Sequence, residues 1–298
     1  MINVTSKKLF IVYSIATILM LFYILSLTVF SSQGNQKKHK SEIQLLHEAD
    51  ISLIDNILIQ NSTGQIILRR QNNMWLVSQD PEQNNFIPAD TQLLQKFFVD
   101  LVSKHIIYKS GKKDEENSYG LSHSDVTAIS LYKNSSPYQT LYFGNQDFTQ
   151  TQRYFTTDEL NSVYLIDSTF DSYLSISSQI WCDPYIISEQ LKDSVFQMGD
   201  IQSLNTQATQ KLLELRHGGF VNSTEIAAIK KEQSKPIKKL LLDMSDKSVI
   251  TINIFNSIFS DNEYIVHTEF DSKRTKQTFN YYTKISLWTY NKINEITL

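Results

Sequence analysis

The hydrophobic pattern of the chain begins with an apolar run, Leu9 to Phe30, that contains no charged residue. An α-helix rises about 1.5 Å per residue, so this run would span roughly 33 Å, enough for the roughly 30 Å core of a bilayer. The run is longer than the apolar part of a cleaved signal peptide, about 7–15 residues, and Val29-Phe30 is a poor cleavage site. The pattern predicts a tail over 1–8, a transmembrane anchor over 9–30, and contact with the lipid bilayer through that anchor.

Lysines lie on both sides of this run. Lys7 and Lys8 directly precede it, whereas Lys37, Lys38 and Lys40 follow it at a distance. Positive residues next to a span have the strongest influence on its orientation. The sequence therefore predicts a cytoplasmic N-terminus and an extracytoplasmic C-terminal body, although the second lysine cluster favours the opposite direction.

A polar stalk is predicted over residues 31–48, followed by a first α+β unit over 49–188. The polar turn 71–73 separates two apolar runs and predicts a β-hairpin. Asp90 precedes apolar pairs at a spacing of four, which predicts the N-cap of a helix that packs on a sheet. Four further runs predict strands: VTAISLY, YQTLYFG, RYFTT and VYLID.

A second, diverged unit is predicted over residues 189–298, with the same order of elements. The segment GQIILRRQNNMWLVS (64–78) resembles TQKLLELRHGGFVNS (209–223), which predicts a second hairpin that turns at Gly218-Gly219. The alternative is that the two stretches are unrelated and share only a generic pattern of hairpin and helix.

The rest of the second unit completes the predicted fold. A helix is expected to open at 234–236 with Ile237, Leu240 and Leu241 on its apolar face, and strands are expected to follow. Strands clustered around one helix per unit favour antiparallel sheets over a parallel one. The predicted fold class is α+β: an N-terminal transmembrane helix and two similar units of antiparallel sheet with one packed helix each.

Charge narrows the classes of partner. Five of the 28 basic residues and none of the 31 acidic residues fall in the first 40 positions, so the remainder has a formal charge of −8. An acidic body argues against nucleic-acid binding and against docking on anionic lipid headgroups.

The candidate metal ligands and nucleophiles are isolated in the sequence. None of the six histidines forms an HxxxH or HExxH pair, and His123-Ser124-Asp125 is interpreted as a turn. The lone cysteine, Cys182, cannot form an intrachain disulfide, and its acidic neighbour disfavours a thiolate, so it is interpreted as a packed thiol. The sequence predicts no catalytic residues, no cofactor and no metal, and thus a protein that is not an enzyme.

Two other hypotheses stay open. Tyrosine and tryptophan suit binding surfaces, and the alternation in Tyr281-Tyr282 and Trp288-Tyr290 suggests one face in and one face out. One hypothesis is therefore an envelope module that binds glycan or peptide through an aromatic groove between the two units. A hydrolase that uses scattered carboxylates such as Asp125 or Asp147 has the least support, because it needs a perturbed carboxylate pair in a pocket.

The order of short motifs over roughly residues 50–190 resembles an uncharacterised bacterial family, the domain of unknown function 4340. The motif positions are Trp75, Asp90, Tyr119, Gly120, Leu121, Gly144, Tyr154 and Tyr164. The chain departs from the family where Ser122-His123-Ser124 follows the Tyr-Gly-Leu motif, because a proline usually comes soon after that motif.

The expected function follows from this resemblance. Members of the family are typically single-span membrane proteins, often encoded beside ABC transporters of the gliding-motility type. The resemblance implies an accessory or scaffold protein of the bacterial inner membrane, with transporter subunits as partners and an extracytoplasmic body. No catalytic residues are established for the family, so the motif positions are expected to be mainly structural.

Overall fold

The computed structural model describes Met20 and residues 40–78, 86–112, 117–122, 124–191, 206–231, 235–244, 247–273 and 276–297. The predicted tail and His123 lie outside the described residues. The predicted anchor also lies outside them, with the exception of Met20. Among the residues that are described, no helix is both long enough and apolar enough to cross a membrane.

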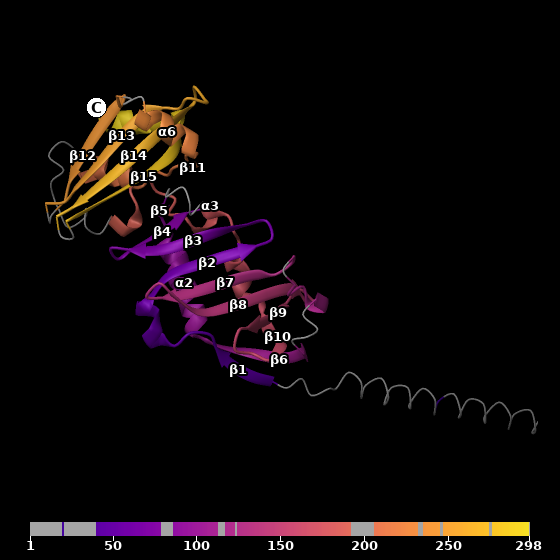
Figure 1. Cartoon of the computed structure of the whole chain (residues 1–298). Helices are drawn as coiled ribbons and strands as arrows, with labels where there is room; N and C mark the ends of the chain where they lie inside the picture. The colour runs from indigo at the N-terminus through magenta and orange to yellow at the C-terminus, as the bar shows by residue number, and fades with distance from the viewer. Residues whose placement is uncertain are drawn as a thin grey trace, which may run out of the picture.

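The first sheet has ten strands, and every neighbouring pair in it is antiparallel (Figure 1). In spatial order the strands are β1 (Lys40–Gln44), β6 (Lys104–Lys112), β10 (Ser162–Asp167), β9 (Gln152–Thr157), β8 (Ser136–Gln146), β7 (Thr127–Lys133), β2 (Ile54–Asn61), β3 (Gly64–Gln71), β4 (Met74–Ser78) and β5 (Ile87–Pro88). The predicted hairpin and the four predicted strands of the first unit are therefore confirmed.

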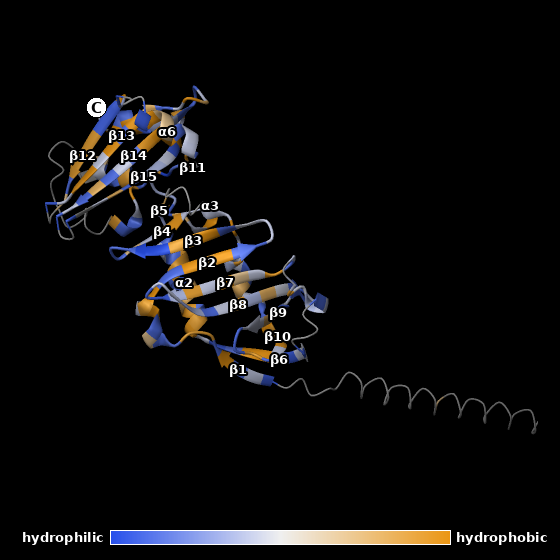
Figure 2. Cartoon of the chain, viewed as in Figure 1, coloured by the Kyte–Doolittle hydropathy of each residue, from blue (hydrophilic) through white to orange (hydrophobic). Residues whose placement is uncertain are grey.

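The core of this sheet is built around helix α2 (Thr91–Val102). Its buried residues recur at a helical spacing, as the sequence predicts: Leu94, Phe97, Phe98 and Leu101. Three short helices complete the unit: η1 (Glu48–Leu53), η4 (Ser168–Tyr173) and α3 (Ser178–Trp181). Hydropathy alternates along the strands of both sheets, which is expected when one face of a sheet packs on a core (Figure 2).

Part of the predicted stalk belongs to this unit. Lys40–Gln44 pairs with β6, and the next two residues, Leu45 and Leu46, are buried in the main core. The short strand contains a single apolar residue, Ile43, so it shows no alternation in the sequence, and the apolar pair that follows it carries the packing.

The second sheet has five antiparallel strands. In spatial order they are β11 (Gly219–Phe220), β15 (Gln277–Ser286), β14 (Glu263–Ser272), β13 (Val249–Asn256) and β12 (Lys238–Asp243). Helices α5 (Thr206–Leu213) and α7 (Leu287–Ile296) contribute to the core on one face, and α6 (Ser223–Lys231) contributes to a smaller cluster with Phe255, Ile265 and Tyr282.

Two predictions for the second unit are wrong. The segment expected to begin a hairpin at 209 is helical, because it belongs to α5, where Leu212 and Leu213 turn into the core. The helix expected to open at 234–236 is strand β12, because burial alternates there: Leu242 is buried and Leu241 is exposed. The described part of the second unit therefore has more than the one expected helix, since α5, α6 and α7 all lie in it, and its order of elements does not repeat that of the first.

The two units contact each other where β15 of the second sheet meets β5 of the first. Tyr281 of β15 is part of the first unit's core, Phe279 and Phe220 pack against that core, and Met74 packs against the core of the second unit. Tyr281 is thus buried between the units. Aromatic side chains of the second sheet fill this junction and are not displayed in a groove there.

Candidate functional site

Four of the motif positions form one structural cluster in the first unit. Gly120 adopts the left-handed φ of +68°, and a Cβ on Gly144 would lie 2.3 Å from the backbone oxygen of Tyr119. The rings of Tyr119 and Tyr154 are 4.7 Å apart. The glycines therefore allow the Tyr-Gly-Leu loop to lie against the sheet.

The other motif positions also have packing roles. Leu121 is buried with Val126 and Val163 beneath the same loop, and Tyr164 packs against the main core. Asp90 caps α2, since its carboxylate accepts hydrogen bonds from the backbone N–H of Gln92 (2.9 Å) and of Leu93 (3.0 Å). These contacts give Leu121 and Tyr164 packing roles and Asp90 a capping role.

Trp75 lies where the first unit meets the second. Its ring is 5.7 Å from that of Phe98, and its backbone N–H donates to Oε1 of Gln190 at 2.9 Å. The Gln190 amide in turn donates to the carbonyl oxygens of Trp75 (2.8 Å) and Ala89 (3.0 Å). One side chain from the connecting segment thus makes three hydrogen bonds to the first unit.

The same connecting segment contains a buried polar group. Both oxygens of the Asp183 carboxylate accept hydrogen bonds, from Ser188 Oγ (2.7 Å) and from the N–H groups of Glu189 (2.6 Å) and Tyr185 (3.0 Å). Burial raises the pKa of Asp183 despite these bonds. They fix the turn that leads from α3 toward the second unit.

His217 pairs with this turn from the second unit. Its Nε2 lies 2.7 Å from the carbonyl oxygen of Asp183, and its Nδ1 accepts the N–H of Gly219 at 3.0 Å. This pattern fits only the neutral imidazole that carries its proton on Nε2. Burial lowers the pKa of His217. The joint therefore depends on an uncharged histidine, and nothing in the local sequence around His217 signals this role.

Residues considered for chemistry lie in structural settings. Cys182 is buried, and burial, together with the nearby Asp183, raises the pKa of its thiol to about 12, so the interpretation as a packed thiol is confirmed. Asp125 bonds within its own turn to Ser122, and Asp147 accepts from Thr149 and from the backbone of its own loop. In the described ranges, no cluster of three or more His, Cys, Asp or Glu could hold a metal ion.

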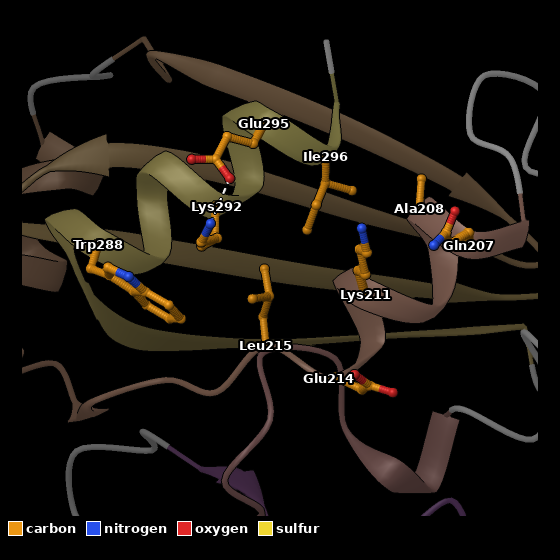
Figure 3. A pocket seen from close by; sticks show the side chains of 9 residues that line it. All are labelled: Gln207, Ala208, Lys211, Glu214, Leu215, Trp288, Lys292, Glu295 and Ile296. Atoms are coloured by element: carbon orange, nitrogen blue, oxygen red, sulfur yellow. Dashed lines mark hydrogen bonds and ion pairs between the residues drawn. The ribbon is translucent and has the colours of Figure 1, made fainter.

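An open groove lies between α5 and α7 on the second unit (Figure 3). Its volume is about 740 Å³. It is lined by Gln207, Ala208, Lys211, Glu214, Leu215, Trp288, Lys292, Glu295 and Ile296. The apolar part comes from Leu215, Ile296 and the indole of Trp288, and each helix side contributes both a lysine and a glutamate.

Trp288 is the one aromatic residue among those that line this groove, and 65% of its surface is accessible. Lys292 Nζ lies 5.9 Å from the centre of the indole ring and 2.6 Å from Glu295 Oε2 (Figure 3). The first contact is a cation–π interaction, and the second keeps the lysine charge neutralised at the rim. An exposed indole beside paired charges can bind an apolar segment that carries its own polar groups.

The sequence pointed to only half of this groove. Trp288 was singled out with Tyr290, but Tyr290 stacks on Tyr264 at 4.2 Å and so has a packing role. The other wall is α5, and the sequence predicted a strand there. The groove could not be found without that helix.

Comparisons of the chain with models of protein families, with curated proteins and with solved structures found no match. The likeness to the domain of unknown function 4340 therefore rests on the order of the short motifs in the first unit.

Proposed function

We propose that this chain is a membrane-anchored extracytoplasmic accessory or scaffold protein that partners an ABC-transporter-like complex and has no catalysis of its own. The apolar run over 9–30 supports the anchor, and the lysines that abut it support an extracytoplasmic body. The motif order supports the bacterial inner membrane and a transporter partner.

The observation that carries the proposal is the groove between α5 and α7. Trp288 exposes 65% of its surface, whereas tryptophan is on average a highly buried residue. Tryptophan is also enriched among the residues that dominate protein–protein interfaces. The paired rim charges provide specificity more than affinity.

Affinity purification of the tagged full-length chain from detergent-solubilised native membranes tests this function. We expect transporter subunits in stoichiometric amounts. Trp288→Ala should lower their recovery about tenfold or more, since a central tryptophan contributes at least about 2 kcal/mol to such a contact.

Phe148→Ala provides the matched control. Phe148 is 98% exposed and lies in the loop between β8 and β9 of the first unit, away from the groove. This variant should recover as much partner as the wild type. Recovery of the chain alone would contradict the proposed partnership. If Trp288→Ala recovers as much partner as the wild type, the groove is not the site at which the partner binds.

A second candidate is an envelope module that binds glycan or peptide. It was expected to use an aromatic groove between the two units, but Tyr281 is buried in that junction. Trp288 favours this function at the α5–α7 groove instead, because an exposed indole face can stack on a sugar ring. Titration of the purified chain with soluble peptidoglycan fragments, followed by tryptophan fluorescence, should give a saturable change that Trp288→Phe removes. An unchanged signal in the wild type would eliminate this candidate.

A further inference from the structure

Strand β12 forms an edge of the five-stranded sheet. β13 pairs with one side of it, and no strand in the described part of the chain pairs with the other side. An edge of this kind presents backbone N–H and C=O groups that can pair with another strand. Figure 1 shows β12 at the end of the body farthest from β1, away from the ten-stranded sheet.

The side chains of β12 alternate between the core and the solvent. Leu240 and Leu242 pack into the core of the second unit, whereas Lys239, Leu241 and Asp243 are exposed. Leu241 exposes 55% of its surface. The solvent-facing side chains of β12 are therefore, in order, a positive, an apolar and a negative one.

We propose that β12 pairs edge to edge with β12 of a second copy of this chain, antiparallel, with the two-fold axis at Leu241. Such a contact is self-complementary, because each residue meets the same strand of the other copy. Lys239 of each copy then lies opposite Asp243 of the other, and the two Leu241 side chains meet at the axis. Opposite charges and apolar pairs directly across two strands both stabilise a sheet.

The neighbouring registers lack this complementarity. An axis at Leu240 places Lys239 opposite Leu241, and an axis at Leu242 places Leu241 opposite Asp243. Each of these sets a charge against an apolar side chain on the same face. A shift by a single residue, instead of two, would place core-facing side chains opposite solvent-facing ones. The charge pattern therefore selects one register.

The same lysine explains why a different strand would be a poor partner. A lysine on an edge strand discourages pairing, because its charge must be matched or solvated. Only a strand that presents an acidic residue opposite Lys239 and a basic residue opposite Asp243 satisfies both positions. The sequence of β12 itself meets this requirement when it runs antiparallel.

The predicted contact is small, since it joins two six-residue strands. An interface far below about 1,200 Å² is usually weak or transient. Cross-linking in place is therefore the appropriate measurement. Cys182 is the sole native cysteine and is buried, so an introduced cysteine is the one available to react.

Disulfide cross-linking of the full chain in native membranes tests the register. Residues directly opposite each other in antiparallel strands have Cα atoms about 4.5–5.5 Å apart, within the range for a disulfide. With a mild oxidant, Leu241→Cys should give a reducible product of twice the chain mass. Lys239→Cys and Asp243→Cys should each give little product alone and should cross-link when the two variants are co-expressed.

Charge exchange in the Leu241→Cys background tests the pairing. Lys239→Asp or Asp243→Lys should each lower the yield about tenfold, because either change creates two like-charge contacts across the axis. The double variant Lys239→Asp/Asp243→Lys should restore the yield. Circular dichroism of each variant confirms that the sheet is intact.

Three results would overturn the inference. The first is that Leu241→Cys gives no homodimeric product. The second is that Leu241→Cys cross-links to a different protein instead of a second copy. The third is that the double charge exchange does not restore the yield. Cross-linking of Lys239→Cys with itself as efficient as that of Leu241→Cys would exclude the proposed register.

Discussion

At the scale of single residues, close contacts around the backbone restrict which residue types fit at several motif positions. Gly144 and Gly120 lie against Tyr119 and Asn145, where a side chain of any size would collide with its neighbours. Arg153 closes the same region, since its guanidinium bonds to the carbonyl oxygen of Gly144 and pairs with Asp171. The glycines at these positions are therefore required by the packing of the loop.

Replacing Gly144 tests this packing. A Cβ at this position would lie 2.3 Å from the backbone oxygen of Tyr119, so Gly144→Ala should lower the free energy of unfolding by about 2–3 kcal/mol. Denaturant unfolding provides the measurement. Gly218→Ala is the control, because the nearest atom there is 3.6 Å away, and it should have little effect. Equal effects from both substitutions would contradict the packing role.

At the scale of elements, local patterns predicted the first unit well and the second poorly. α2 was predictable because Asp90 caps it and its apolar residues recur at a helical spacing. β12 was not, because Lys-Lys-Leu-Leu-Leu-Asp fits a helix or a strand equally well, and only its pairing with β13 decides between them. α5 and the groove that it forms were missed because a hairpin was expected at the same residues.

The cap of α2 gives a prediction at this scale. Asp90→Ala leaves the N–H groups of Gln92 and Leu93 without their acceptor, and should reduce the free energy of unfolding by about 1 kcal/mol. Asp90→Asn keeps an acceptor oxygen and should recover most of the loss. Thermal or denaturant unfolding of both variants measures the difference, and an alanine variant as stable as wild type would argue against the cap.

At the scale of the whole molecule, the segment between the two sheets determines how they move together. Gln190 bonds to the first sheet, Tyr281 donates its hydroxyl to the carbonyl oxygen of Ile186 at 2.7 Å, and His217 bonds to Asp183. The cores of the two units also share side chains across the junction. The units should therefore act as one body and not as two domains on a free hinge.

The histidine at this joint makes the stability of the body depend on pH. Burial lowers the pKa of folded His217, so the unfolded chain binds the proton more readily. The contribution is complete above the unfolded pKa of about 6.5 and is lost as pH falls below it. The free energy of unfolding should therefore decrease from about pH 7.5 to about pH 5, a range above the ordinary titration of carboxylates.

His217→Gln separates this contribution from the others. The pKa of His267 is also lowered by burial and acts in the same direction, whereas the raised pKa of Asp183 acts in the opposite one. Glutamine can bond without titrating, so the variant should lose less stability than the wild type between about pH 7.5 and about pH 5. Denaturant unfolding at several pH values measures this, and parallel curves for the two proteins would contradict it.

The locked joint has a mechanical consequence. β1 marks one end of the body and the second sheet marks the other (Figure 1), and the connection between them is held by side chains from both units. The body therefore behaves as a spacer of fixed length. A partner that binds the α5–α7 groove would be kept at a constant height above the point where the chain enters the fold, and a pull on that partner would be transmitted through the joint to the first sheet.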